Sequence, residues 1–421
     1  MNQLQKLIDL HDDIMYLWFS GYLESLSFSQ RDHISRIKVL NRFFRVGKLL
    51  VKDFRMIFYK RKSHLYSNNW LILETLNNYS ALKFLKENEN YSFVKIKYDI
   101  KDSIKDQNVA YFLPRWKLVF DMLFPLYLII MLIFNDKRKA YWDCFDVYFQ
   151  VIGLFQIFRI SLKKASPGLL VFSNDHSMAS RSLLMAAKSL GIKTAYIQHA
   201  SVSQYFPPLK FDVALLEGKD AYEKYKAVGK IESKIQLVGM PKFDKYSGVI
   251  NRNNKIESIG ICYNIGDSIE EVSKLIDMLQ SLNEGIKIKL RPHPADSRSV
   301  NIKYKIDVCD SKRVNSFEFL QQVDCIIVGN SSIILEAALL NVLPLYFKPI
   351  VKGKYDYYGF LKNNIAVSVS NNEELKSLLF QYKNNKPNVF DNTKYYNEIV
   401  GTEDYGFSSV LVKKTLNGFC Q

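Results

Sequence analysis

The sequence predicts an α/β protein of two Rossmann-like domains that face a central crevice, with an N-terminal helical extension and a helical insert. Three observations predict this class. A chain of 421 residues is expected to form two domains. Short apolar runs alternate with helical patterns from residue 69 onward, a βαβ rhythm typical of parallel sheets. A polar segment at 247–255, SGVINRNNK, separates two such stretches and is predicted to be the linker.

Composition narrows the class of protein further. A hydrophobic content of 48% with 24% charged residues excludes a disordered chain. The formal net charge of +16 implies an acidic partner: nucleic acid, an anionic membrane face or an anionic substrate. Five scattered cysteines without CxxC spacing favour reduced cytosolic thiols over a disulfide framework or a zinc site. The polar start, MNQLQKLIDLHDD, is unlike a secretory signal peptide.

Four segments are expected along the chain. Residues 1–65 are predicted to form a basic helical extension, because apolar residues recur there every three or four positions. Residues 66–248 are predicted to form the first Rossmann-like domain, with the helical insert at about 115–165. Residues 249–385 are predicted to form the second, and helices within 386–421 are expected to pack back across the linker.

The insert contains the most apolar run of the chain, at 118–134. Its 17 residues include Asp121 and Pro125, which places it at the short end of the range for a membrane span. An aromatic-rich run at 145–164 follows it. Three alternatives stay open for this pair: a true span, helices lying in a membrane interface, or a buried core or oligomer contact.

In the second half, the residues expected to carry chemistry lie in loops after predicted strands. RPHP at 291–294 follows IKIKL, and its two prolines hold His293 in one direction beside Arg291. GNSS at 329–332 precedes the helical run IILEAALL, where free backbone N–H groups and a positive dipole end favour an anion. The donor-binding candidates are Arg291, His293, Gly329, Asn330, Ser331, Ser332 and Glu336, the last as acceptor from a ribose hydroxyl.

Each of these assignments has a plainer alternative. RPHP can be an ordinary loop with a surface histidine. Either serine of GNSS can be a simple N-cap, and Glu336 can lie on a solvated helix face. Gly239, in VGMPKFD at 238–244, is a candidate for backbone contact with the donor phosphate across the crevice, or else a structural turn.

The first half contains the candidates for the catalytic base and the acceptor site. His199 ends a predicted strand in YIQHASVS, and histidine is well suited to accept a proton near pH 7. Asp175 ends the preceding strand in FSNDHS and is the alternative base, able to orient an acceptor hydroxyl. His176, Ser201 and Ser203 are candidates for acceptor contact, and the plainer alternative for His199 is a core histidine.

Several common signatures are absent from the sequence. There is no GxGxxG after a strand, no Walker A motif, no HExxH and no GxSxG, and no DxD pattern is convincing. A metal-independent diphosphate site built from His, Arg and Ser, with no cofactor, is therefore the simpler prediction.

The order QHAS, VGMPKFD, RPHP and GNSSIILEA, over roughly residues 168–370, resembles the two-Rossmann GT-B superfamily of nucleotide-sugar enzymes. The nearest likenesses are bacterial capsule and cell-wall polymer transferases, namely the CDP-glycerol polymerases and the HP-motif sialyl- and Kdo-transferases. The UDP-N-acetylglucosamine 2-epimerases share the same order of elements. The sequence departs from the polymerases at Ala200, where they have Gly, and it lacks the acidic motif of the sialyltransferases.

The resemblance implies roles for the domains and for single residues. Residues 66–248 would bind the acceptor and 249–385 the nucleotide donor. His293 would bind the nucleotide phosphates or assist the leaving phosphate. Ser331 and Ser332 would bind the phosphate and Glu336 the nucleotide ribose, and His199 matches a histidine that is a candidate catalytic base in the polymerases.

These observations predict a cytoplasmic glycosyltransferase, peripheral to the inner face of the cell membrane. It would transfer a sugar or polyol phosphate from a nucleotide-activated donor, with CMP or CDP slightly favoured over UDP, to a surface polysaccharide or lipid-linked acceptor. An anionic membrane surface is an expected partner, nucleic acid is not, and a homo-oligomer is left open. The alternatives are a nucleotide-sugar 2-epimerase and a non-catalytic basic binding module.

Overall fold

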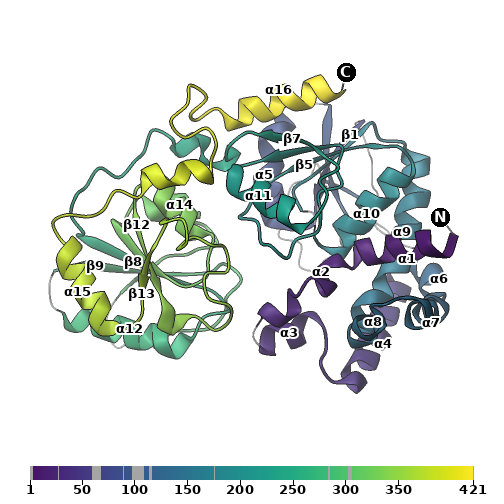
Figure 1. Cartoon of the computed structure of the whole chain (residues 1–421), viewed down its shortest axis with the longest axis horizontal. Helices are drawn as coiled ribbons and strands as arrows, with labels where there is room; N and C mark the ends of the chain where they lie inside the picture. Colours follow the sequence, from purple (N-terminus) through teal and green to yellow (C-terminus); the bar gives the residue numbers. More distant parts are fainter. Residues whose placement is uncertain are drawn as a thin grey trace. The chain divides into compact units, whose positions relative to one another are not determined.

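In the computed structural model (Figure 1), the chain forms two compact units. Unit 1 consists of Met1–Glu217, Ala221–Lys242 and Ser409–Gln421, and unit 2 of Gly218–Asp220 and Phe243–Ser408. The residues that the structure describes are 3–26, 28–58, 68–88, 90–96, 109–112, 116–174, 176–282, 285–301 and 306–420.

Unit 1 is built on a seven-stranded parallel sheet in the order β3-β2-β1-β4-β5-β6-β7. The order reverses between β1 and β4. Near-continuous burial of its inner strands is typical of a parallel sheet that is covered on both faces. The strands are β1 (Asn69–Leu73), β2 (Tyr91–Lys95), β3 (Val109–Tyr111), β4 (Leu169–Phe172), β5 (Lys193–Ile197), β6 (Val213–Leu216) and β7 (Lys234–Leu237).

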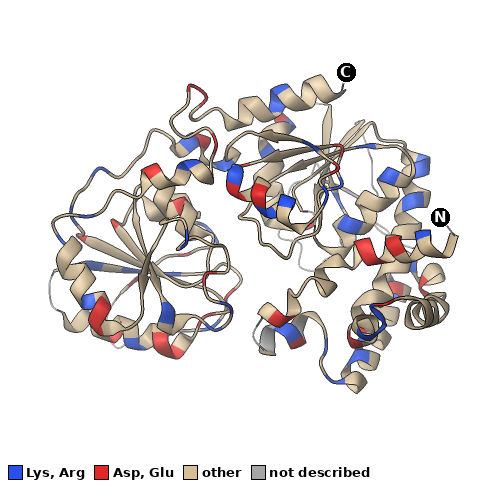
Figure 2. Cartoon of the chain, in the orientation of Figure 1, with Lys and Arg blue, Asp and Glu red and all other residues tan. Residues whose placement is uncertain are grey.

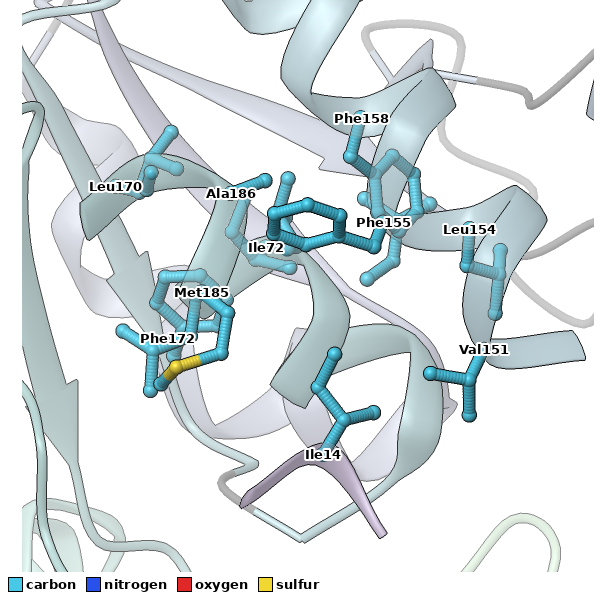
Figure 3. Close-up of a cluster of buried hydrophobic side chains, with 14 of the residues drawn as sticks. Ile14, Ile72, Val151, Leu154, Phe155, Phe158, Leu170, Phe172, Met185 and Ala186 are labelled. Carbon is cyan, nitrogen blue, oxygen red and sulfur yellow. The ribbon is translucent and has the colours of Figure 1, made fainter. Parts of the chain in front are cut away.

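One face of this sheet is covered by α1 (Gln3–Ile14), α9 (Phe145–Ala165) and α10 (Met178–Ser189). Figure 3 shows the core that they form, in which Ile72 and Phe172 of the sheet meet Phe155 of α9, Met185 of α10 and Ile14 of α1. Helix α9 is apolar on nearly all sides because it is the buried core helix of unit 1.

The other face is covered by α5 (Leu76–Leu82) and by the last helix, α16 (Ser408–Cys420). Val412 and Leu416 of α16 pack against the sheet, and Lys193 at the start of β5 donates to the backbone oxygen of Phe419 at 2.9 Å. Between η5 (Phe390–Tyr395) and α16, the segment expected to be helical consists largely of turns. Two glycines of this segment, Gly401 and Gly406, have φ of 74° and 85°, a conformation that interrupts a helix.

The N-terminal extension and the insert form a group of helices on unit 1. The extension contributes α2 (Tyr16–Phe19), η1 (Leu23–Ser25), α3 (Phe28–Ile34) and α4 (Val39–Ile57), and the insert contributes α6 (Lys117–Asp121), α7 (Phe124–Phe134) and α8 (Arg138–Asp143) ahead of α9. The apolar run at 118–134 is therefore two short helices, and Pro125 lies in the first turn of the second. Neither is long enough to cross a bilayer.

Among the described residues, α9 is the one helix that is long and apolar enough to cross a membrane, judged by length and composition alone. Its burial against α10 and the sheet accounts for the same composition.

Unit 2 is built on a six-stranded parallel sheet in the order β10-β9-β8-β11-β12-β13, which is the Rossmann order with its reversal between β8 and β11. The prediction of two Rossmann-like α/β units is thus confirmed. The strands are β8 (Ser258–Tyr263), β9 (Lys287–Pro292), β10 (Asp307–Val308), β11 (Cys325–Val328), β12 (Leu343–Phe347) and β13 (Val367–Val369). The helices of the unit are α12 (Ile269–Ser281), α13 (Ser316–Leu320), α14 (Ile333–Leu339) and α15 (Asn372–Tyr382), with η3 (Pro241–Tyr246) and η4 (Lys348–Ile350).

The polar segment predicted to be a linker is held on unit 2. Asn251 and Asn253 each donate a side-chain hydrogen bond to Asp324 at 3.1 Å. Asp324 precedes β11, and its carboxylate also accepts from the backbone and hydroxyl of Ser258, where β8 begins. The asparagines therefore close the amino-terminal edge of the sheet, opposite to the edge that carries the predicted site.

Candidate functional site

The two predicted donor-binding loops of unit 2, RPHP and GNSS, lie at the carboxyl ends of β9 and β11. Between these strands runs β8, and the loop after it, residues 264–268, lies at the same edge of the sheet but was not predicted to be part of the site. Because the strand order reverses between β8 and β11, the connections that leave these strands run to opposite faces of the sheet. Ligands of open α/β sheets bind at this position. The topology therefore brings RPHP and GNSS to the switch point of unit 2.

His293 follows β9 directly and is held by hydrogen bonds to the end of β8 and to its own loop. Its backbone N–H donates to the oxygen of Tyr263 at 2.8 Å, and its oxygen accepts from Asp296. The N–H of Ala295 donates to Nδ1 at 3.2 Å, so the neutral ring carries its proton on Nε2. Desolvation lowers the pKa of His293, and its neighbour Arg291 acts in the same direction against Asp296. At neutral pH the ring is therefore an uncharged Nε2–H donor on an exposed loop.

A residue that the sequence did not single out, Arg298, braces this loop. Its guanidinium binds the Asp296 carboxylate through both oxygens, at 2.9 and 2.7 Å. It also donates to the backbone oxygens of Asp267, at 3.0 Å, and Asn264, at 2.7 Å. Hydrogen bonding from Arg298 lowers the pKa of Asp296, which keeps the pair ionised. The β9 loop is thereby fixed to the β8 loop.

Replacing Arg298 with Ala is expected to weaken nucleotide binding by about ten- to a hundredfold, because small displacements of a binding group have effects of that size. The melting temperature should also fall, since the side chain of Asp296 is 1% exposed and would be left without its counter-charge. Arg298→Lys should not restore binding, because an ammonium lacks the planar fork. Arg313→Ala is the matched control: Arg313 pairs with Asp310 on the exposed surface of the same unit. Equal nucleotide affinity in Arg298→Ala and wild type, by titration calorimetry, would contradict the bracing role.

Asp267 is the second residue that the sequence analysis missed. Its side chain is 2% exposed, and it accepts from the backbone N–H of Asn264 at 2.7 Å. Burial raises the pKa of Asp267 to about 7, although the Asn264 hydrogen bond and Arg298 act in the opposite direction. A Cβ atom at Gly329 would lie 2.6 Å from Oδ1 of Asp267. Gly329 is therefore required for close approach of the β8 and β11 loops, and not only for a tight turn.

The other GNSS residues differ in how they are engaged. Asn330 is used within the fold, since its amide donates to the oxygen of Lys354 at 2.6 Å and accepts from Tyr346 and Tyr357. Ser331 and Ser332 are half-buried ahead of α14. Ser332 occupies the N-cap position without a side-chain cap hydrogen bond, and the hydroxyl of Ser331 accepts from Ile333 at a long 3.4 Å. Both hydroxyls are thus only weakly engaged at the helix start, which leaves them suited to a ligand.

Glu336 and Arg291 are both buried. Glu336 is 6% exposed on α14, whose residues are all buried, so the alternative of a solvated helix face is excluded. Arg291 is 7% exposed; its guanidinium donates to the oxygen of Val314 at 3.0 Å and lies over the ring of Phe319. These contacts hold the guanidinium of Arg291 inside unit 2. Its predicted contact with a phosphate stays a prediction.

In unit 1, His199 and His176 lie beyond the carboxyl ends of the paired strands β5 and β4. His199 is half-buried, and its neighbour Gln198 is fixed by hydrogen bonds with Glu217 at 2.9 and 3.2 Å. His176 stacks on Phe206 with ring centroids 4.2 Å apart. The alternative base, Asp175, lies outside the described residues.

The remaining candidates of unit 1 lie inside it. Ser201 and Ser203 are 7% and 1% exposed, and the Ser203 hydroxyl accepts from the backbone of Tyr205. A contact of Ser203 with an acceptor would require this loop to move. Gly239 is buried with φ of 76°, the left-handed conformation that favours glycine. The alternative of a structural turn therefore accounts for Gly239 without a ligand.

The switch point of unit 1, between β1 and β4, carries a carboxylate that the sequence analysis missed. Glu74 follows β1, and its carboxylate accepts from the hydroxyls of Ser177 and Ser180 at the start of α10. Asn78 binds the Ser173 hydroxyl beside it at 3.0 Å. The available signal was an acidic residue directly after the strand-like NWLIL. Among the described residues of the chain, no group of three or more His, Cys, Asp or Glu is placed to hold a metal ion.

No protein-family model matches the sequence, and no curated protein matches it. Solved structures of similar fold include the UDP-GlcNAc 2-epimerase from Neisseria meningitidis bound to UDP-GlcNAc, at 11% identity over 83% of this chain and 99% of that one, with a TM-score of 0.49. The glycosyltransferase of kitacinnamycin has 10% identity over 84% and 99%, and the wall teichoic acid polymerase TagF 12% over 90% and 98%, both with TM-scores of 0.49. Likenesses this distant assign no activity to the chain.

Proposed function

We propose that the chain is a glycosyltransferase that takes a sugar or polyol phosphate from a nucleotide-activated donor bound by unit 2. One observation carries the proposal. The switch point of a Rossmann-order sheet is lined by a loop that holds a neutral Nε2–H donor, His293, and by the weakly engaged hydroxyls of Ser331 and Ser332. Arg298 fixes the first loop to the β8 loop. Such preorganised donors suit a diphosphate.

In this reaction the bond between the donor's activated atom and its nucleotide phosphate breaks, and negative charge grows on the departing phosphate. His293 would donate to that oxygen from Nε2, with the hydroxyls of Ser331 and Ser332 as further donors. His293 would act as an uncharged hydrogen-bond donor, because its lowered pKa keeps the ring neutral. Glu336 would accept from a ribose hydroxyl. No step of this mechanism uses a metal ion.

The acceptor side of the reaction is assigned to unit 1. His199 or Asp175 would take the proton of the attacking hydroxyl, with His176 in contact with the acceptor. We propose a surface polysaccharide or lipid-linked acceptor, a CMP- or CDP-linked donor ahead of a UDP-linked one, and a location on the cytoplasmic side of the membrane. The composition, the charge of +16 and the resemblance in motif order support these choices.

A second candidate, a nucleotide-sugar 2-epimerase, is favoured by one observation. Epimerisation at C2 needs acids and bases that remove and return a proton at carbon, and Glu74 places a carboxylate at the switch point of unit 1. Its engagement with two serine hydroxyls makes it equally suited to fixing the start of α10.

One experiment separates the two activities. Purified protein is incubated in deuterium oxide with CMP-, CDP- and UDP-linked sugars, with and without a lipid-linked oligosaccharide acceptor. The transferase proposal predicts nucleotide release that depends on acceptor, and no deuterium at C2 of the recovered sugar. Deuterium at C2 without acceptor would establish the epimerase instead. If a folded protein gives neither nucleotide release nor deuterium at C2, the proposal of an enzyme acting on these donors is overturned.

A further inference from the structure

The helices of the N-terminal extension and the insert expose a large apolar surface on unit 1. On α4, the apolar residues at spacings of three and four are the exposed ones. They are Leu40, Phe43, Phe44, Val51, Phe54 and Phe58, each more than half exposed. A helix of a soluble protein normally turns such a stripe to the core. The orientation of α4 is the reverse.

Buried polar contacts explain why the apolar stripe of α4 faces outward. The buried residues of α4 are Arg42, Asp53 and Met56. Asp53 binds Lys117 of α6 at 2.8 Å, and both are largely buried. Arg42 donates to the oxygen of Trp142 at 2.9 Å. The polar face of α4 is thus bound to the insert, which leaves its apolar face outward.

A second stripe continues over α6 and α7. Here too the exposed side chains recur at three and four, although the two helices are short. They are Val119, Met122, Leu123, Leu126, Ile129 and Ile133, with exposed fractions of 43% to 69%. Helices α4 and α6 contact each other, and α4, α6 and α7 all contact α9 (Figure 1). Two apolar stripes therefore belong to one helical group on a fixed core helix.

The exposed charges of the same helices are mostly basic. Lys48, Lys52 and Arg55 are exposed on α4, and Lys137, Arg138 and Lys139 are exposed at the start of α8. Figure 2 marks the basic residues of these helices in blue. Of the acids nearby, Asp121 is buried with Lys117 and Asp146 with Arg45, whereas Asp136 is exposed and Asp143 is partly exposed, so the exposed basic residues outnumber the exposed acids. An anionic surface is thereby favoured, whereas a second copy of this face would bring cations together.

We infer that α4, α6 and α7 form a docking surface for an anionic lipid bilayer, entered by the two apolar stripes to the depth of the headgroups. Apolar side chains on one face and Lys and Arg beside them are the features of helices that lie in the membrane interface. The inference stands apart from the proposed activity, because it uses no residue of either candidate site. It also accounts for the very apolar run at 118–134, whose two helices are each too short to span a bilayer.

The test uses the full chain and vesicles of phosphatidylglycerol mixed with phosphatidylcholine, against phosphatidylcholine alone, in a sedimentation assay at about 0.15 M salt. Wild type should bind the anionic vesicles. The combined variant Leu40→Ser, Phe44→Ser and Phe54→Ser should lose about tenfold or more in affinity. Its substitutions are at exposed positions, so the fold should be kept. The matched control is Phe380→Ser with Phe407→Ser, equally exposed residues of unit 2, which should bind as wild type does.

Two further measurements test the electrostatic contribution to vesicle binding and the insertion of the helices into the bilayer. Lys48→Gln, Lys52→Gln and Arg55→Gln together should reduce binding to anionic vesicles by about tenfold or more and weaken its salt dependence. Trp116 and Trp142 are 58% and 41% exposed beside the stripes, so their fluorescence should shift to the blue on binding. Wild type that does not sediment with anionic vesicles would overturn the inference. So would vesicle binding unchanged in the apolar variant, or a dimer in size-exclusion chromatography that this variant abolishes.

Discussion

Asp267→Asn is expected to stabilise the protein at pH 8 by about 2–4 kcal/mol and at pH 5 by only about 1 kcal/mol. Burial holds the pKa of Asp267 at about 7, against 3.8 without burial. As pH rises from about 4 to 7, the unfolded chain loses this proton while the folded chain keeps it. Wild type therefore loses stability over that window, and above pH 7 the full loss remains. Asparagine mimics the neutral acid and has no such loss.

The measurement is urea unfolding of both proteins at pH 5 and pH 8. Asp324→Asn is the control of opposite sign. Burial alone would raise the pKa of Asp324, but hydrogen bonds from Asn251, Ser258 and the Glu257 backbone lower it. Its replacement should therefore destabilise at pH 8. Equal stability of Asp267→Asn and wild type at pH 8 would mean that Asp267 is ionised and satisfied in the fold.

Gly329→Ala is expected to lower the free energy of unfolding by about 1–3 kcal/mol and to abolish detectable nucleotide binding. The added Cβ would lie 2.6 Å from Oδ1 of Asp267 and 3.3 Å from a methyl of Val351. Asp267 is buried and bound to Asn264, so it cannot swing aside without losing that hydrogen bond. The β8 and β11 loops must then separate, which displaces Ser331 and the candidate site with it.

Gly418→Ala is the matched control, because nothing lies within 4 Å of a Cβ at that position of α16. It should leave nucleotide binding unchanged and slightly stabilise the helix. Thermal and urea unfolding of the two variants give the comparison. Gly329→Ala with wild-type stability and wild-type nucleotide affinity would show that the two loops are not in close contact.

The architecture could be predicted because its signals are local. Short apolar runs between helical patterns indicated the parallel sheets, and proline and glycine marked the loops that carry His293 and Gly329. Those loops reached the predicted edge of the sheet because the carboxyl ends of parallel strands coincide. Local signals also indicated the amphipathic pattern of α4.

What could not be predicted depends on contacts between segments far apart. Arg298 acts on Asn264 and Asp267, which belong to a different loop. Asn330 looked free for a ligand, yet Tyr346 and Tyr357 already engage its amide. Periodicity cannot say which face of a helix turns inward either, because on α4 the buried ion pairs decide it against the apolar stripe.

The proposed function requires unit 2 to bind the phosphate of a nucleotide through His293. The most direct test is a thermal-shift titration of wild type and His293→Ala with CMP, CDP, UDP, GDP and ADP. Wild type is predicted to be stabilised selectively by a pyrimidine nucleotide, with CMP or CDP ahead of UDP, and His293→Ala to lose that shift while keeping its own melting temperature. A shift of equal size in both proteins, or none in wild type with any nucleotide, would contradict the assignment.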